Sequence, residues 1–326
     1  MDARITKKRL GQMLSYDWIK IIACIVAGIV LWSLIFTTTA TRLNPAQTFT
    51  VYAYMGTAPT DKFSAKINSK TALAEKYSYD VIETAIVDLT TAGDQAYTLL
   101  EARTSVQEGN AAFVSPMEVS GAKYKDDRGE EYTPTYVQDI VMRLYANVLT
   151  PEKAEGTPKP SFFERTEEFL SGYFSDINNE ETINLQKVES VFRARIDEQN
   201  DKRYKNETQI AQGIADETAR IKGYRQNYLA VKGYLEEGVI ALEQTDIYVS
   251  YGDTTEKYTG YYSVNLCPDE RMAGLKELIG YKDGDGNFTA KNMQLVLLDL
   301  LGDEYGYGVY ECYALICTLV ETYRAA

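Results

Sequence analysis

One long hydrophobic segment lies near the amino terminus of the chain. Residues 21–40 form an apolar run without a charged side chain, and about 20 such residues in a helix cross the roughly 30 Å hydrocarbon core of a bilayer. The run predicts a transmembrane helix at 21–40. A cleaved signal peptide with its cut after Ala40 is the alternative, although leaders of that kind usually have a shorter apolar region.

Behind this segment, hydrophobic and polar residues follow the periods of strands and helices in turn. Residues 47–54, 79–89 and 111–115 are rich in β-branched, aromatic or small apolar types, which is typical of strands. Helical spacing lies between them, at 61–77 and at 94–108. A β-α-β-α-β order indicates an open, mostly parallel sheet in an α/β domain, and right-handed crossovers place the first strand between the other two.

The pattern then becomes helical from 160 to 245, with apolar residues recurring every seven positions in its second half. Such a narrow seam suits a long helix packed on another. The polar stretch 198–207 is either the bend of a helical hairpin or an exposed turn of one longer helix. Alternation returns at 246–266 and predicts either a hairpin or two strands of a sheet. Further helices are expected at 268–279, 289–301 and 309–324.

Charge decides the expected orientation. Residues 1–20 carry five basic and two acidic side chains, and positive charge is retained in the cytoplasm. We therefore expect a single-pass protein of the cell membrane, with a cytoplasmic basic segment at 1–20 and one extracellular domain at 41–326. Within that domain, the pattern predicts a first lobe at 47–150, a helical segment at 160–245, and return strands with carboxyl-terminal helices at 246–326.

Composition excludes several classes of function. The formal net charge is −13, and because residues 1–20 are positive, the rest of the chain carries about −16. Such an acidic domain disfavours nucleic acid and anionic lipid as partners. The sequence has no histidine, which removes Ser-His-Asp and Cys-His catalysis and most zinc sites. We expect no enzyme activity, no metal and no cofactor.

Two local features have alternative interpretations. Cys312 and Cys317 are about 140° apart on a helix and should not pair there. Either Cys267 bonds one of them, or all three are buried thiols. The segment 283–287, Asp-Gly-Asp-Gly-Asn, is similar to a calcium loop, but a helix-loop-helix calcium site requires glycine and glutamate further along, at positions occupied here by phenylalanine and glutamine. It is predicted to be a surface turn.

Four stretches of the first lobe follow one another in an order that is similar to that of a known protein family. They are Phe49-Thr-Val-Tyr-Ala-Tyr54, Tyr79-Asp-Val-Ile-Glu83, Ser105-Val-Gln-Glu-Gly-Asn110 and Ala112-Phe-Val114. In this order the chain resembles extracellular solute-binding proteins of the type 2 periplasmic-binding fold, which serve ABC importers. The resemblance covers 47–117 well and 160–245 loosely, and it implies a membrane-anchored variant of that family.

Ligands of open α/β sheets bind outside the carboxyl ends of the strands. In this chain those ends carry Tyr54, Gly56 and Thr57 after the first strand, and Ser115 and Met117 after the third. We expect these five residues to bind the ligand.

Together, the pattern and the resemblance predict a membrane-anchored extracellular solute-binding protein. It would capture a small solute, such as a saccharide, for an ABC-type permease in the same membrane. The alternative is a non-catalytic accessory protein of the cell envelope that docks on a membrane permease through the helical segment 160–245.

Overall fold

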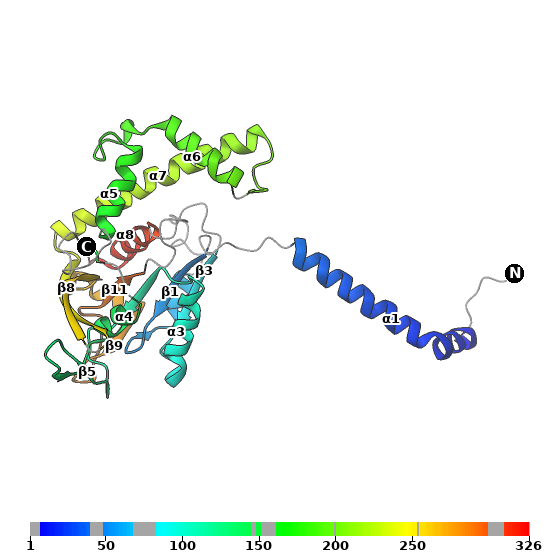
Figure 1. Ribbon diagram of the computed structural model, residues 1–326, viewed down its shortest axis with the longest axis horizontal. Coiled ribbons are helices and arrows are strands. Elements are labelled where there is room, and N and C mark those ends of the chain that lie inside the picture. Colours follow the sequence, from blue (N-terminus) through cyan, green and yellow to red (C-terminus); the bar gives the residue numbers. More distant parts are fainter. Residues whose placement is uncertain are drawn as a thin grey trace. The chain divides into compact units, whose positions relative to one another are not determined.

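The computed structural model describes residues 7–39, 48–67, 83–144, 148–150, 161–198, 200–252, 254–298 and 310–325 (Figure 1). They belong to two compact units, Met1–Leu43 and Asn44–Ala326. The first unit holds helix α1 (Lys7–Thr39). Its Trp18–Ile35 stretch has a mean hydropathy of 2.3 and is long and apolar enough to cross a membrane, so α1 could be a membrane anchor or a signal sequence.

The second unit is built on a six-stranded mixed sheet of order β3-β1-β4-β11-β8-β7. Its strands are β1 (Thr48–Ala53), β3 (Glu83–Asp88), β4 (Ala111–Val114), β7 (Ala241–Tyr251), β8 (Thr254–Asn265) and β11 (Gln294–Leu297). As predicted, β1 lies between β3 and β4 and is parallel to both. β11 runs antiparallel to β4 and β8, and β7 runs antiparallel to β8. Four of the six strands therefore point the same way, which confirms an α/β fold with a mostly parallel sheet.

Helices cover both faces of this sheet, which is why β1 and β4 are buried along nearly their whole length. One hydrophobic cluster packs under α3 (Ala96–Ser105) and α4 (Tyr136–Leu144). The other packs under α2 (Lys62–Ile67), α5 (Phe162–Tyr173), α7 (Glu207–Glu236) and α8 (Glu311–Tyr323). Short elements complete the unit: β2 (Ala58–Pro59), η3 (Gly93–Gln95), β5 (Tyr124–Lys125), β6 (Glu131–Tyr132), η4 (Glu180–Thr182), η5 (Glu270–Glu277), β9 (Ile279–Lys282) and β10 (Phe288–Thr289).

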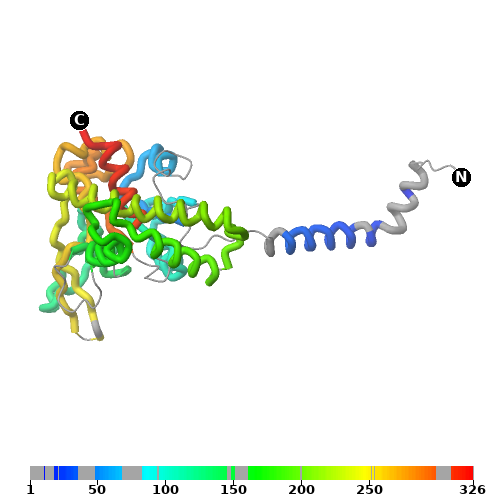
Figure 2. The backbone as a smooth tube through the Cα atoms, turned by 90° about the horizontal axis from the view of Figure 1, so that it is seen from above, coloured from blue at the N-terminus to red at the C-terminus, as the bar shows by residue number. Residues whose placement is uncertain are grey.

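The helical segment contains a hairpin, as one of the two alternatives predicted. Helix α6 (Leu185–Glu198) ends where the polar stretch begins, and α7 starts after Asn206, whose side chain accepts a hydrogen bond from the Gln209 amide at 3.0 Å. The two helices lie side by side (Figure 2). They approach closely at Gly213, where a Cβ atom would collide with the ring of Phe192.

In the carboxyl-terminal part, one predicted helix is a strand. The prediction of a helix at 289–301 is wrong, because Gln294–Leu297 is strand β11, paired with β4 on one side and with β8 on the other. A four-residue apolar run cannot be assigned to helix or strand by its period, and here the neighbouring strands decide. Residues 299–309 lie outside the described residues.

Other local expectations are confirmed. Residues 246–266 belong to the hairpin β7–β8, one of the two predicted alternatives, and it begins earlier, at Ala241. Cys267, Cys312 and Cys317 are buried free thiols. The 283–287 segment is the turn between β9 and β10, in which Asp283 Oδ1 accepts the backbone amides of Asp285 at 3.0 Å and Asn287 at 2.8 Å.

Strands β7, β8 and β11, which follow α7 in the sequence, complete the sheet that β1, β3 and β4 begin.

Candidate functional site

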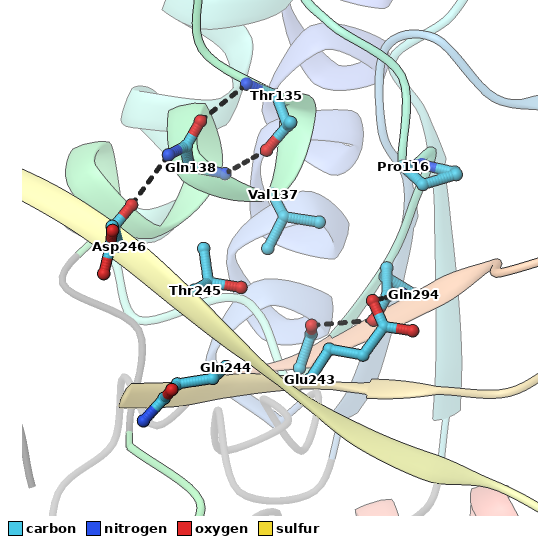
Figure 3. Close-up of a pocket in the computed structure, with 10 residues that line it drawn as sticks. Pro116, Thr135, Val137, Gln138, Glu243, Gln244, Thr245, Asp246 and Gln294 are labelled. Carbon is cyan, nitrogen blue, oxygen red and sulfur yellow. Dashed lines mark hydrogen bonds between the residues drawn. The ribbon is translucent and has the colours of Figure 1, made fainter. Parts of the chain in front are cut away.

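A polar pocket of about 260 Å³ lies between the edge of the sheet and the start of α4 (Figure 3). The helix side contributes Pro116, Thr135, Val137 and Gln138. The sheet side contributes residues 243–246 of β7, Ser263 of β8 and Gln294 of β11. Because Gln294 pairs with Val114, the last residue of β4, the pocket lies at the carboxyl ends of the parallel strands. This is the edge at which open α/β sheets bind ligands.

An irregularity in the β7–β8 ladder shapes the pocket. Leu242 pairs with Val264, and the next pair is Gln244 with Tyr261, so β8 contains one more residue than β7 in this interval. Consecutive residues of a regular strand point to opposite faces. A bulge breaks this alternation and re-aims side chains, and here four consecutive β7 residues, 243–246, all contribute to the lining.

The floor of the pocket is a connected set of polar groups in which Ser263 and Gln294 are buried and Glu243 is exposed. Ser263 is 1% exposed and Gln294 is 2% exposed. The Ser263 hydroxyl donates to Gln294 Oε1 at 2.8 Å, and Gln294 Nε2 donates to the Asn292 carbonyl at 3.1 Å and to Glu243 Oε2 at 3.4 Å. The Asn265 amide also donates to Glu243. These bonds fix the orientation of the Gln294 amide, because each of its atoms has a distinct partner.

The opposite wall is the capped start of α4. Thr135 Oγ1 accepts from the Gln138 amide at 3.2 Å, and Gln138 Oε1 accepts from the Thr135 amide at 2.9 Å, which forms a capping box. Gln138 Nε2 also donates to the Asp246 carbonyl at 2.7 Å and ties α4 to β7. The Asp246 carboxylate bonds Lys257 and Thr259, both at 2.6 Å. Burial acts to raise the pKa of Asp246, but these hydrogen bonds outweigh it and hold the pKa below its ordinary value.

Asp139, the residue after Gln138, ties the same helix to neighbouring elements through its carboxylate. Its carboxylate is fully buried and accepts hydrogen bonds from the hydroxyls of Tyr54 at 2.7 Å, Tyr97 at 3.1 Å and Tyr124 at 2.6 Å. Arg143 Nε donates to it at 3.0 Å, one turn along α4. Burial, followed by the hydrogen bond to Asp139, raises the pKa of Tyr124 to about 12. Burial and the charge of Asp139 likewise raise the pKa of Tyr54.

The five residues expected to bind ligand gather around the start of α4, beside the pocket. Tyr54 belongs to the Asp139 network, and Thr57 Oγ1 donates to the Tyr54 carbonyl at 2.6 Å. Ser115 is fully buried, and its hydroxyl accepts from the Met117 amide at 3.2 Å. Gly56 has a φ of +80° and lies so near the ring of Tyr136 that a Cβ atom would collide with it. None of the five lines the pocket, which the same loop reaches through Pro116.

Sequence reasoning did not single out Ser263, Gln294 or Glu243. A signal for two of them exists. Ser263 stands in Tyr-Tyr-Ser-Val-Asn, and Gln294 in Met-Gln-Leu-Val-Leu, so each is a polar residue between apolar neighbours. Polar side chains are uncommon at fully buried positions, and such an interruption marks a strand position that faces something other than hydrophobic core.

The polar groups that line the pocket can recognise a ligand by hydrogen bonds. Ser263 donates to an amide oxygen, which is not a general base, so its hydroxyl is not activated as a nucleophile. In the described part of the chain, no group of three or more His, Cys, Asp or Glu residues could hold a metal ion. Comparison of the chain with protein-family models, with curated proteins and with solved structures gave no match.

Proposed function

We propose that this chain is a membrane-anchored binding protein that holds a small polar solute in the pocket between β7 and α4. The observation that carries the proposal is the buried polar floor formed by Ser263 and Gln294, together with the β7–β8 bulge that aims residues 243–246 into the same space. Burying polar groups is costly unless they are hydrogen-bonded. A domain that needed only a packed core at this position would place apolar residues there.

The size and lining of the pocket limit the solute. Pockets for drug-sized ligands have volumes of about 300–1,000 Å³, so a pocket of about 260 Å³ suits a smaller molecule. The described residues of its lining include no aromatic side chain. A saccharide bound here would therefore be held by hydrogen bonds and not by stacking on a tyrosine ring.

The membrane arrangement is part of the proposal. Helix α1 would remain as an uncleaved anchor, and the five basic residues before position 21 would keep the amino terminus in the cytoplasm. The unit Asn44–Ala326 would then be extracellular. Delivery of the solute to an ABC-type permease in the same membrane follows from the resemblance of residues 47–117 to solute-binding proteins.

The test is ligand binding by the full chain in detergent micelles. Thermal unfolding is measured against panels of sugars, polyols, amino acids and amines, since a ligand at about 100 times its dissociation constant stabilises the folded state by about 2.7 kcal/mol. The variant Thr245→Phe narrows the pocket and should abolish the stabilisation. Thr255→Phe, on the same β7–β8 hairpin outside the pocket lining, is the matched control and should retain it. A hit that both variants bind equally would place the ligand elsewhere.

Docking on a permease through the helical segment is the second candidate, and the surface of α6 gives it less support. The exposed apolar residues of α6 are Leu185 and Val191, at 57% and 41% exposure. They are six positions apart, which separates them by about 120° around the helix axis, so they do not form one apolar face. Crosslinking of the full chain from these two positions in native membranes would test this candidate, and recovery of a permease would favour it.

A further inference from the structure

Among the described residues that line the pocket, two are ionisable, Glu243 and Asp246. Both are acidic, and the protein neutralises the charge of only one of them with a basic side chain. Asp246 forms an ion pair with Lys257 at 2.6 Å. The Glu243 carboxylate accepts hydrogen bonds from the side-chain amides of Asn265 and Gln294, which are neutral donors. In the described part of the chain, Glu243 has no lysine or arginine within ion-pair distance. The pocket therefore holds one negative charge that the protein orients but does not neutralise.

The hydrogen bonds of the floor also favour one kind of ligand. Gln294 Nε2 donates both of its protons, one to Glu243 and one to the Asn292 carbonyl. The Ser263 hydroxyl donates its proton to Gln294 Oε1. On the opposite wall, Gln138 Nε2 is directed to the Asp246 carbonyl. The groups that remain on the floor are acceptors, namely the other lone pairs of the Glu243 carboxylate and of Ser263 Oγ. An acceptor-rich floor is complementary to a solute that donates.

From this geometry we propose that the pocket selects a small solute bearing a primary ammonium group, with Glu243 as the residue that determines specificity. The inference rests on the proposed function and names the class of its solute. An ammonium group supplies three N–H donors and one positive charge and has no acceptor. Its N–H groups would donate to the Glu243 carboxylate and to Ser263 Oγ. Its positive charge would balance the negative charge of Glu243, which the side-chain amides of Asn265 and Gln294 orient.

The position of Glu243 fits this role. Glu243 lies opposite the extra residue of β8, between the pairs Leu242–Val264 and Gln244–Tyr261, so its side chain is placed by the bulge. Bulges in natural sheets commonly re-aim a side chain next to a functional site. Glu243 is itself exposed, so it can meet a solute entering from solvent while Gln294 beneath it stays buried.

The experiment compares probes that differ in charge and little in shape. The full chain in nanodiscs of neutral lipid is titrated calorimetrically with ethanolamine and 1,4-diaminobutane, with their hydroxyl counterparts ethylene glycol and 1,4-butanediol, and with glycolate as the anion. The variant Glu243→Gln removes the charge and keeps an acceptor oxygen. Glu236→Gln, at an exposed position of α7 outside the pocket, is the matched control.

The wild-type chain should bind the amines more tightly than the diols and should not bind glycolate. Glu243→Gln should weaken amine binding by about tenfold, a modest factor because the carboxylate is partly solvated, and should change diol binding much less. Glu236→Gln should match wild type, and amine affinity should fall with added salt.

Two results would overturn the inference in different ways. Diols that bind as tightly as amines, with Glu243→Gln at wild-type affinity for both, would refute selection of an ammonium group and leave the proposed solute pocket standing. If no probe binds, and the sugar and amino-acid panels also fail to stabilise the chain, the proposed function itself fails, and the inference fails with it.

Discussion

Replacing Asp139 by Asn tests whether one buried carboxylate holds four elements of the sheet domain together. Its donors are Tyr54 after β1, Tyr97 on α3, Tyr124 on β5 and Arg143 on α4, at 2.6–3.1 Å. Asparagine keeps the shape but loses the charge, and it turns an NH₂ group toward donors. Breaking a buried ion pair by removing one partner costs about 3–5 kcal/mol. Because the Arg143 side chain is 29% exposed, water can take over part of its charge, and we expect the lower end, about 3 kcal/mol.

The assay is equilibrium unfolding of the full chain, followed by near-ultraviolet circular dichroism. For a domain of this size about 3 kcal/mol corresponds to a fall in Tm of about 6–12 °C. A double-mutant cycle with Tyr54→Phe should give a coupling of about 1.5–3 kcal/mol, the range for hydrogen bonds to charged groups. Tyr97→Phe should give less, because its bond is the longest of the three. The exposed Asp285→Asn is the control and should stay within about 0.5 kcal/mol of wild type. A loss below about 1 kcal/mol for Asp139→Asn, or no coupling to Tyr54, would refute the reasoning.

Three further predictions follow from packing and from titration. Burial raises the pKa of Tyr124 and Tyr262 to about 12 from an ordinary value of 10.0; between these pH values the unfolded chain loses protons that the folded chain keeps, so the free energy of unfolding, measured as a function of pH, should fall as the pH rises from about 10 toward 12, less steeply in Tyr124→Phe. Gly213→Ala should destabilise the α6–α7 hairpin by about 1–3 kcal/mol, because the added Cβ atom collides with Phe192. Gly223, on the same helix, has open space around it, so Gly223→Ala should stabilise the hairpin by up to about 1 kcal/mol. Urea titrations of the two variants measure both effects. Cys267 is buried and its pKa is raised by burial to about 11, so a thiol-reactive dye at pH 7 should label it only after unfolding; labelling of the native chain would contradict its burial.

The order of the first three strands could be predicted from the sequence because it follows from local pattern and one general rule. Each strand is apolar over a few residues, each connection is long enough for a crossover, and right-handed crossovers put β1 in the middle. Strand β11 could not be predicted in this way. Its four residues are strand only because β4 and β8 lie on either side of them, and that partnership joins parts of the chain that are far apart in the sequence.

The five residues predicted from the sequence lie beside the candidate pocket, and none of them lines it. The rule that ligands bind at the carboxyl ends of strands led to Ser115 and Met117, and Pro116 between them lines the pocket. The remaining lining depends on the register between β7 and β8, where one extra residue brings Glu243 over Gln294. A bulge changes which face the following side chains take, and a periodicity of two along one strand does not show where its partner strand holds an extra residue.

Helix α4 joins the network that stabilises the domain to the pocket that we propose as its binding site. Gln138 faces the pocket and bonds β7, while Asp139, the next residue, is about 100° further round the helix and accepts hydrogen bonds from three tyrosines. Any solute in the pocket is held between this helix and strands that the rest of the sheet supports. The position of α4, and with it the distance across the pocket, is thus fixed by a buried charge network that the solute never contacts. Such a support is what a pocket for a small solute requires, because hydrogen bonds are directional and a displacement of about 1 Å across the pocket would break them.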